Sequence, residues 1–336
     1  MKNENLLDQD KKRMEKKKVF IKRKKGKINI QLNKRKKSRV SPLYNKYNIQ
    51  KYDLHPDYLF DEFIDLIPEN VADYIDDGNN YMVRIVEALY HFKQCALIGP
   101  SGTGKTHAVY LIAELTGLPL WEINCALNTS SYDLIGRYIG LGKENWIDGQ
   151  VTLWLKHGGL LYLDEVNMMR QDVASRLNPV LDARGHLIIT EKDNEIIPRH
   201  EYSYCIVSIN PLRAEHAGVK RLNIAFKRRM SIWIDFSYPS IAQKISQDEI
   251  KLIMDRSHID RATASKILTV GAEMRRQYLN GDILYGPSPR DLINWAILFN
   301  NSGDPILSAE STIIPMTSDD SEERDIIRNL VMNVFK

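Results

Sequence analysis

The stretch that decides the fold is Gly99-Pro-Ser-Gly-Thr-Gly-Lys-Thr106. It matches the phosphate-binding loop G-x-x-x-x-G-K-[ST] at every defined position. The apolar run Cys95–Ile98 leads directly into it. After it, apolar residues recur at helical spacing: Ala108, Leu111, Ile112 and Leu115. The order strand, loop, helix that this motif requires is therefore predicted.

Each residue type in the loop has a chemical reason. Glycines let the backbone turn so that several N–H groups point to one centre, and the helix N-terminus adds positive potential for phosphate. Lys105 is predicted to reach the β- and γ-phosphates of a nucleotide, and the Thr106 hydroxyl to ligate Mg²⁺.

A second apolar strand, Leu160–Leu163, ends in Asp164 and Glu165. A carboxylate at this position can hold magnesium through a water shell, so Thr106 and Asp164 are the predicted metal-binding pair. Glu165 can accept a proton from the attacking water as general base. The predicted nucleotide-binding set is Gly99, Pro100, Ser101, Gly102, Thr103, Gly104, Lys105, Thr106, His107 and Asp164.

A third strand, Tyr204–Ile209, ends at Asn210-Pro211. An uncharged polar side chain at this point can hydrogen-bond the attacking water or the γ-phosphate. The competing interpretation is an asparagine that only caps a strand before proline.

Together these segments resemble AAA+ ATPases over about residues 85–300, with Gly99–Thr106 as Walker A, Leu160–Glu165 as Walker B and Asn210 as sensor 1. More narrowly, the chain resembles the MoxR and cobaltochelatase small-subunit group, which has a dynein-related ATPase module. Further matching segments occur in the order and spacing of that group: Ser131–Gly136, Trp146–Leu153, His157–Asn167, Leu177–Asp182 and Leu222–Arg229.

The resemblance implies two further kinds of arginine. Leu222–Arg229 looks like the A-x-x-x-R-F segment, which implies that Arg229 is the finger inserted into the neighbouring subunit's site. The family often has Asp before this arginine and this chain has Arg228, so either arginine can be the finger. The alternative is that both form surface salt bridges.

Gly286-Pro-Ser-Pro-Arg290 resembles sensor 2, which implies that Arg290 acts on the γ-phosphate of its own subunit. The local sequence agrees, because Ser288 can cap a helix, Pro289 suits its first turn and Asp291 completes a capping box. The competing interpretation is an arginine on a solvated first turn.

Two insertions are also expected. Leu187–Pro198 predicts a hairpin that turns through Glu191–Asn194. Gly136–Gly149 is interpreted as a helix-2 insertion that faces a central channel, with the alternative that Trp146 is simply packed.

Composition bounds the class of protein. Of 336 residues, 43% are hydrophobic and only three are cysteines, which excludes global disorder and a disulfide scaffold. No apolar run approaches membrane-spanning length and the basic start lacks the apolar core of a secretory signal, so we expect a cytoplasmic protein without a membrane partner. The formal charge of +4 hides an asymmetry: residues 1–40 hold 17 Lys and Arg against four acids.

These features predict four parts: a basic, disordered tail over 1–40, a leader over 41–80, an α/β nucleotide-binding domain over 81–237, and a helical lid with a C-terminal extension over 238–336. The predicted fold class is an α/β P-loop NTPase of AAA+ type. Its parallel sheet lies between helices, and the small helical lid follows it.

The predicted activity is magnesium-dependent ATP hydrolysis, with ATP and Mg²⁺ as cofactors. The resemblance implies a homo-oligomeric ring, expected to be a hexamer, that remodels a protein client such as a chelatase complex or a protein with a von Willebrand A domain. One alternative is a nucleic-acid-associated motor anchored through the basic residues 11–39. Another is a nucleotide-gated scaffold, against which the Asp164-Glu165 pair argues. The base preference, ATP or GTP, stays open.

Overall fold

The computed structural model describes residues 46, 47, 49, 52–55, 60–140, 145–211 and 222–336. The predicted basic tail, 1–40, lies outside the described residues, as do residues 141–144 of the predicted insertion. Residues 51–336 form a unit separate from residues 1–50.

A five-stranded sheet with the order β2-β5-β8-β1-β9 forms the centre of the unit. All of its neighbouring strands run parallel. The strands are β1 (Gln94–Ile98), β2 (Leu120–Asn124), β5 (Gly159–Asp164), β8 (Ser203–Ile209) and β9 (Trp233–Asp235). β1, β5 and β8 are buried almost throughout, as expected for parallel strands covered on both faces.

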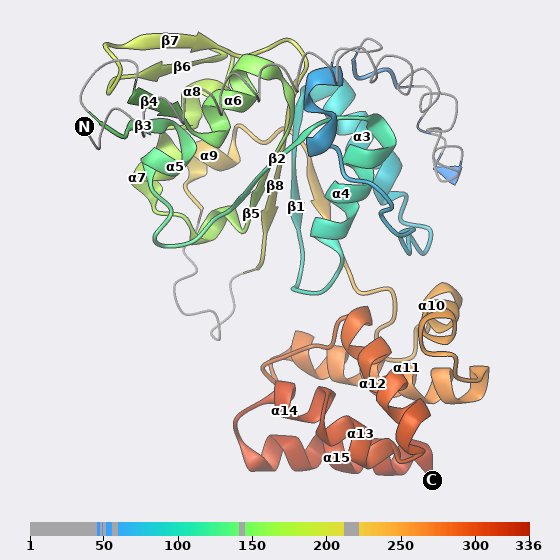
Figure 1. The fold of residues 1–336 in the computed structure, drawn as a ribbon. Helices are drawn as coiled ribbons and strands as arrows, with labels where there is room; N and C mark the ends of the chain where they lie inside the picture. The colour runs from blue at the N-terminus through green and yellow to red at the C-terminus, as the bar shows by residue number, and fades with distance from the viewer. Residues whose placement is uncertain (1–45, 48, 50–51, 56–59, 141–144, 212–221) are drawn as a thin grey trace, which may run out of the picture. The chain divides into compact units, whose positions relative to one another are not determined.

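Helices cover both faces of this sheet. Figure 1 shows α3 (Tyr81–Phe92) and α4 (Lys105–Thr116) on one side and α6 (Gln150–His157) on the other. Shorter helical segments are η1 (Asp61–Leu66), α5 (Ser131–Leu134), η3 (Val166–Met168), α7 (Gln171–Ser175), α8 (Asn178–Leu181) and α9 (Ile224–Lys227). The predicted fold class, a parallel sheet between helices with a helical region after it, is confirmed.

The layered packing explains where the polar residues gather. Trp154 of α6 and Phe226 of α9 lie in one hydrophobic core with Leu163 of β5 and Val207 of β8. Because the strands are parallel and in register, their carboxyl ends meet at one edge of the sheet. The phosphate loop and the polar residues that follow β5 and β8 therefore start from the same edge.

Two antiparallel hairpins project from this framework. The predicted hairpin is confirmed as β6 (His186–Ile189) paired with β7 (Glu195–Pro198). The Gly136–Gly149 insertion contains a second hairpin, in which β3 (Gly136–Tyr138) pairs with β4 (Trp146–Asp148). Trp146 is packed there: its ring lies edge-on to Tyr138 at 5.0 Å, and its Nε1 donates to Asp148 at 2.8 Å.

The C-terminal region is helical, as expected. It consists of α10 (Gln247–Ser257), α11 (Arg261–Asn280), α12 (Pro289–Ser302), α13 (Pro305–Glu310), α14 (Ile313–Thr317) and α15 (Ser321–Phe335). The cap expected at Ser288 is present. Ser246 and Asp260 accept backbone N–H groups at the starts of α10 and α11, and Ser288 forms a full capping box with Asp291 on α12. Within the described ranges, no helix combines the length and the apolar character needed to cross a membrane.

We predict that Leu163→Ala lowers the free energy of unfolding by about 2–5 kcal/mol, because it leaves a cavity at a fully buried position of β5. Leu127→Ala is the matched control, since that side chain is 46% exposed, and we expect a change within about 0.5 kcal/mol. Urea unfolding of both variants measures the difference. Equal loss in the two would contradict the assignment of β5 to the core.

Candidate functional site

The phosphate loop joins β1 to α4 and has the backbone that its glycines allow. Gly102 and Gly104 adopt φ values of +75° and +86°, in the left-handed region that favours glycine. Gly99 is required by a close approach, because a Cβ there would lie 2.4 Å from the carbonyl oxygen of Phe236. α4 then begins at Lys105.

Two tyrosines from outside the loop support it. The Tyr74 hydroxyl donates to the Thr103 carbonyl at 3.0 Å, and the Tyr238 hydroxyl donates to the Ser101 carbonyl at 2.8 Å. Inside the loop, the Thr103 hydroxyl donates to the Pro100 carbonyl at 2.9 Å. Protein hydroxyl groups thus donate to the loop carbonyls of Pro100, Ser101 and Thr103.

The Lys105 ammonium lies among three oxygens. Its Nζ donates to the carbonyls of Gly99 at 2.7 Å and Pro100 at 2.8 Å, and to Asn210 Oδ1 at 2.8 Å. Burial lowers the pKa of Lys105 to about 8, although the nearby carboxylates of Asp164 and Glu165 act in the opposite direction. This charge is therefore poorly solvated, and a phosphate would stabilise its protonated form.

Asp164 is held at the end of β5 by hydroxyl groups. Its Oδ1 accepts from Tyr162 at 2.7 Å and from Ser208, and its Oδ2 lies 3.3 Å from the Thr106 hydroxyl. The Thr106–Asp164 pair fits a magnesium site in donor type, because Mg²⁺ takes oxygen ligands directly or through bound waters.

Glu165 has an unusual backbone next to this pair. Its φ is +52°, which is uncommon for a residue other than glycine, and its N–H donates to the Ser208 hydroxyl at 2.9 Å. The Glu165 Oε1 accepts from Asn210 Nδ2 at 2.6 Å. Positions of backbone strain occur often at functional sites, where surrounding contacts hold them.

Asn210 therefore joins two predicted catalytic groups, because its amide oxygen contacts Lys105 and its amide nitrogen contacts Glu165. Asn167 supports it by donating to the Asn210 carbonyl at 3.1 Å. Five residues predicted from sequence are brought together in this way: Lys105, Thr106, Asp164, Glu165 and Asn210.

His107 lies differently from the other residues of the predicted nucleotide-binding set. Its Nε2 is 2.8 Å from the Ala72 carbonyl oxygen, and its ring stacks on Tyr74. The side chain thus contacts the leader, away from the loop carbonyls around Lys105.

Sequence reasoning missed the supporting hydroxyls of Tyr162 and Ser208. A signal for both existed, because side chains two residues apart on a strand share a face. Tyr162 precedes Asp164 by two positions, and Ser208 precedes Asn210 by two.

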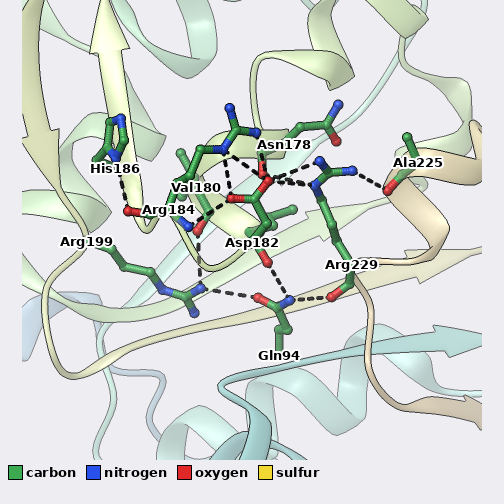
Figure 2. A network of polar contacts seen from close by, with 10 residues as sticks. Gln94, Asn178, Val180, Asp182, Arg184, His186, Arg199, Ala225 and Arg229 are labelled. Atoms are coloured by element: carbon green, nitrogen blue, oxygen red, sulfur yellow. Dashed lines mark hydrogen bonds and ion pairs between the residues drawn. The ribbon is translucent and has the colours of Figure 1, made fainter.

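Arg229 belongs to a separate polar network (Figure 2). Its guanidinium contacts Asp182 Oδ2 through Nε at 3.3 Å and through NH2 at 3.0 Å, and it donates to the carbonyls of Asn178 and Ala225. Arg184 contacts the same carboxylate at 2.8 Å. Hydrogen bonds from Arg184 and then from Arg229 hold the pKa of Asp182 well below its usual range.

The same network fixes the backbone of Arg229. The Gln94 side chain, at the start of β1, donates to the carbonyls of Leu181 and Arg229. Arg199, which is half-buried, donates to the Gln94 amide oxygen at 3.2 Å, as Figure 2 shows. Arg228 and Arg290 are exposed instead, the latter on the first turn of α12.

Comparison with known proteins finds a family match for each of two parts of the chain. Residues 94–230 match the AAA domain of the dynein-related subfamily, and residues 249–334 match the CbbQ/NirQ/NorQ C-terminal domain. Protein CbbQ of Hydrogenophilus thermoluteolus is 31% identical over 242 residues, which cover 71% of this chain and 86% of that protein. The chain belongs to the CbbQ/NirQ/NorQ family of AAA+ ATPases.

Other relatives agree. The denitrification regulatory protein NirQ of Stutzerimonas stutzeri is 30% identical over 240 residues, or 70% of this chain and 82% of NirQ. The aerobic cobaltochelatase subunit CobS of Sinorhizobium sp is 25% identical over 264 residues, or 76% of this chain and 74% of CobS. The resemblance to the MoxR and cobaltochelatase group is confirmed, and the chain is an ATPase of the AAA+ class.

We predict that ADP affinity falls as pH rises through about 8, by up to about tenfold per pH unit. Bound phosphate raises the pKa of Lys105, so binding is strongest below pH 8, where the free ammonium is already protonated. Calorimetric titrations from pH 7 to 9 measure this. Lys105→Met should bind ADP weakly and with an affinity that does not depend on pH. Lys156→Met, which removes an ion pair with Asp148, should keep the pH dependence of ADP affinity. A pH-independent affinity of the wild-type chain would contradict the role of Lys105.

Proposed function

We propose that this chain is a cytoplasmic, magnesium-dependent ATPase that works as a hexameric ring and remodels a protein client. The observation that carries the proposal is the pair of hydrogen bonds made by Asn210, at 2.8 Å to Lys105 and 2.6 Å to Glu165. They support the proposal because they bring Lys105, Asn210 and Glu165 together, beside the oxygens of Thr106 and Asp164.

Hydrolysis joins a water oxygen to the γ-phosphorus and breaks its bond to the β–γ bridging oxygen, which releases ADP. Glu165 accepts the proton that the water loses, and Asn210 orients this water against the γ-phosphate. Lys105 neutralises charge on the β- and γ-phosphates. Thr106 and Asp164 would hold Mg²⁺, which supplies charge neutralisation at the same oxygens.

In the proposed ring, an arginine of a neighbouring subunit supplies a further positive charge to the nucleotide site. Arg228 and Arg229 follow α9 and belong to a different part of the unit from Lys105, so we assign their role to the site of a neighbouring subunit. Between them, the contacts favour Arg228: it is exposed, whereas the Arg229 guanidinium is already bound to Asp182. Arg290 acts within its own subunit.

The client is a protein, by analogy with CobS, which is a subunit of a cobaltochelatase. A chelatase-like complex and a protein with a von Willebrand A domain are the proposed classes. Exposed apolar side chains on the two hairpins suit such a contact: Ile139, Ile147, Ile188 and Ile196. The charge of residues 1–40 supports a second candidate, a motor held on nucleic acid by its tail.

We predict that Glu165→Gln lowers ATP hydrolysis at least about 100-fold and leaves nucleotide binding intact, because the amide keeps an oxygen for Asn210 and loses the base. Phosphate release, nucleotide titration and light scattering with ATP measure rate, affinity and ring size. Glu122→Gln, on the exposed face of β2, is the control. Unchanged hydrolysis in Glu165→Gln would sink the proposed mechanism.

The two arginines give a second prediction. Arg229→Ala should lower the free energy of unfolding by about 1–2 kcal/mol through its lost hydrogen bonds, whereas Arg228→Ala should change it by less than about 0.5 kcal/mol. Arg228→Ala should still lose most hydrolysis. Mixing it with Glu165→Gln subunits should restore activity, because one neighbour then supplies the arginine and the other the base. If mixing restores ATP hydrolysis only for Arg229→Ala, Arg229 is the arginine finger. If mixing restores hydrolysis for neither variant, a site shared between subunits is excluded.

A further inference from the structure

Tyr238 follows β9 in the segment that leads from the sheet to the C-terminal helices, and it is buried. Its hydroxyl is 2.8 Å from the Ser101 carbonyl oxygen in the phosphate loop and 3.3 Å from the Gly286 carbonyl oxygen. This one hydroxyl thus bridges the phosphate loop and the segment that precedes α12.

Arg275 of α11 fixes the tyrosine ring in place. Its guanidinium carbon lies 4.8 Å from the centre of the Tyr238 ring, a cation–π distance. The side chain is completely buried and forms a two-pronged ion pair with Glu249 of α10, at 2.7 and 3.1 Å. Removing one partner of such a pair leaves an uncompensated buried charge, so the pair holds its surroundings in one arrangement.

The remaining Arg275 donors reach the segment before α12 and the segment after β9 that carries Tyr238. Nε donates to the Pro287 carbonyl at 2.7 Å, and NH1 donates to the Ser240 carbonyl at 3.1 Å. Arg275 therefore links the segment after β9 to the residues just before α12 through hydrogen bonds. The Tyr238 hydroxyl links the same segment to the phosphate loop.

These contacts end next to Arg290. Ser288 is the N-cap of α12, and a Cβ built on Gly102 of the phosphate loop would lie 2.7 Å from its Cβ. Gly286 and Pro287 come directly before Ser288, and Arg290 lies two residues after it. A shift of the loop at Ser101 or Gly102 is therefore passed to the first turn of α12 by direct contact.

We propose that Tyr238 is a positioning residue that sets Arg290 relative to the phosphate loop, and that Arg275 and Glu249 hold it in register. The proposal rests on the proposed function, because it assigns Arg290 to the γ-phosphate. Tyr238 itself donates to a carbonyl on the loop and does not reach the reacting atoms. Its loss should therefore lower kcat more than it raises KM.

The test is a double-mutant cycle on the full chain with Tyr238→Phe, Arg290→Ala and the double variant. Phe keeps the ring over Arg275 and removes only the hydroxyl. We expect kcat for ATP to fall about tenfold in Tyr238→Phe with KM within about threefold, to fall further in Arg290→Ala, and to be the same in the double variant as in Arg290→Ala.

Tyr204→Phe is the matched control, because Tyr204 is equally buried and also donates its hydroxyl to a backbone carbonyl, that of Leu54. Equal kcat in Tyr238→Phe and Tyr204→Phe would overturn the inference, because only a structural role would remain. Independent, multiplying effects of Tyr238→Phe and Arg290→Ala would overturn it too. A wild-type chain that binds ATP and never hydrolyses it would instead refute the proposed function.

Discussion

The arrangement of this site depends on the need to bury one ammonium group. Lys105 is 6% exposed, and a charge in that position requires oxygen atoms in place of water. Two of them come from the loop itself, and the third is the side chain of Asn210. This contact requires β8 beside β1, and β5 on the far side of β8 then brings Asp164 and Glu165 to the same edge. The burial of the Lys105 ammonium thus accounts both for the position of β8 beside β1 and for the oxygen-rich composition of the site.

The sequence predicted the parts whose chemistry is local. The loop, the strands before Asp164 and Asn210, and the cap at Ser288 each depend on a few consecutive residues, and the structure contains all of these elements. The short strands β2 and β9 were not predicted, because their three to five residues have no periodicity that separates them from a loop or a helix.

Contacts between distant segments were beyond the same reasoning. Nothing near Tyr74 or Tyr238 in the sequence indicates that their hydroxyls reach the phosphate loop. His107 follows Thr106 directly in the sequence, but a helix turns successive side chains about 100° apart, and the His107 side chain contacts Ala72. Likewise, the pairing of Arg229 with Asp182 joins residues 47 positions apart. The two family matches end at 230 and begin at 249, so Tyr238 and Ser240 lie in the interval between them, where no motif draws attention to them.

In the proposed ring, the network around Asp182 would affect how neighbouring subunits meet. Arg184 and Arg229 share a single carboxylate, so this cluster carries an excess positive charge even before the exposed Arg228 is added. A neighbouring subunit filled with triphosphate offers a denser counter-charge than one filled with diphosphate. Bound triphosphate would then strengthen the electrostatic attraction between neighbouring subunits of the proposed ring. Loss of phosphate or a rise in salt concentration would weaken the same attraction.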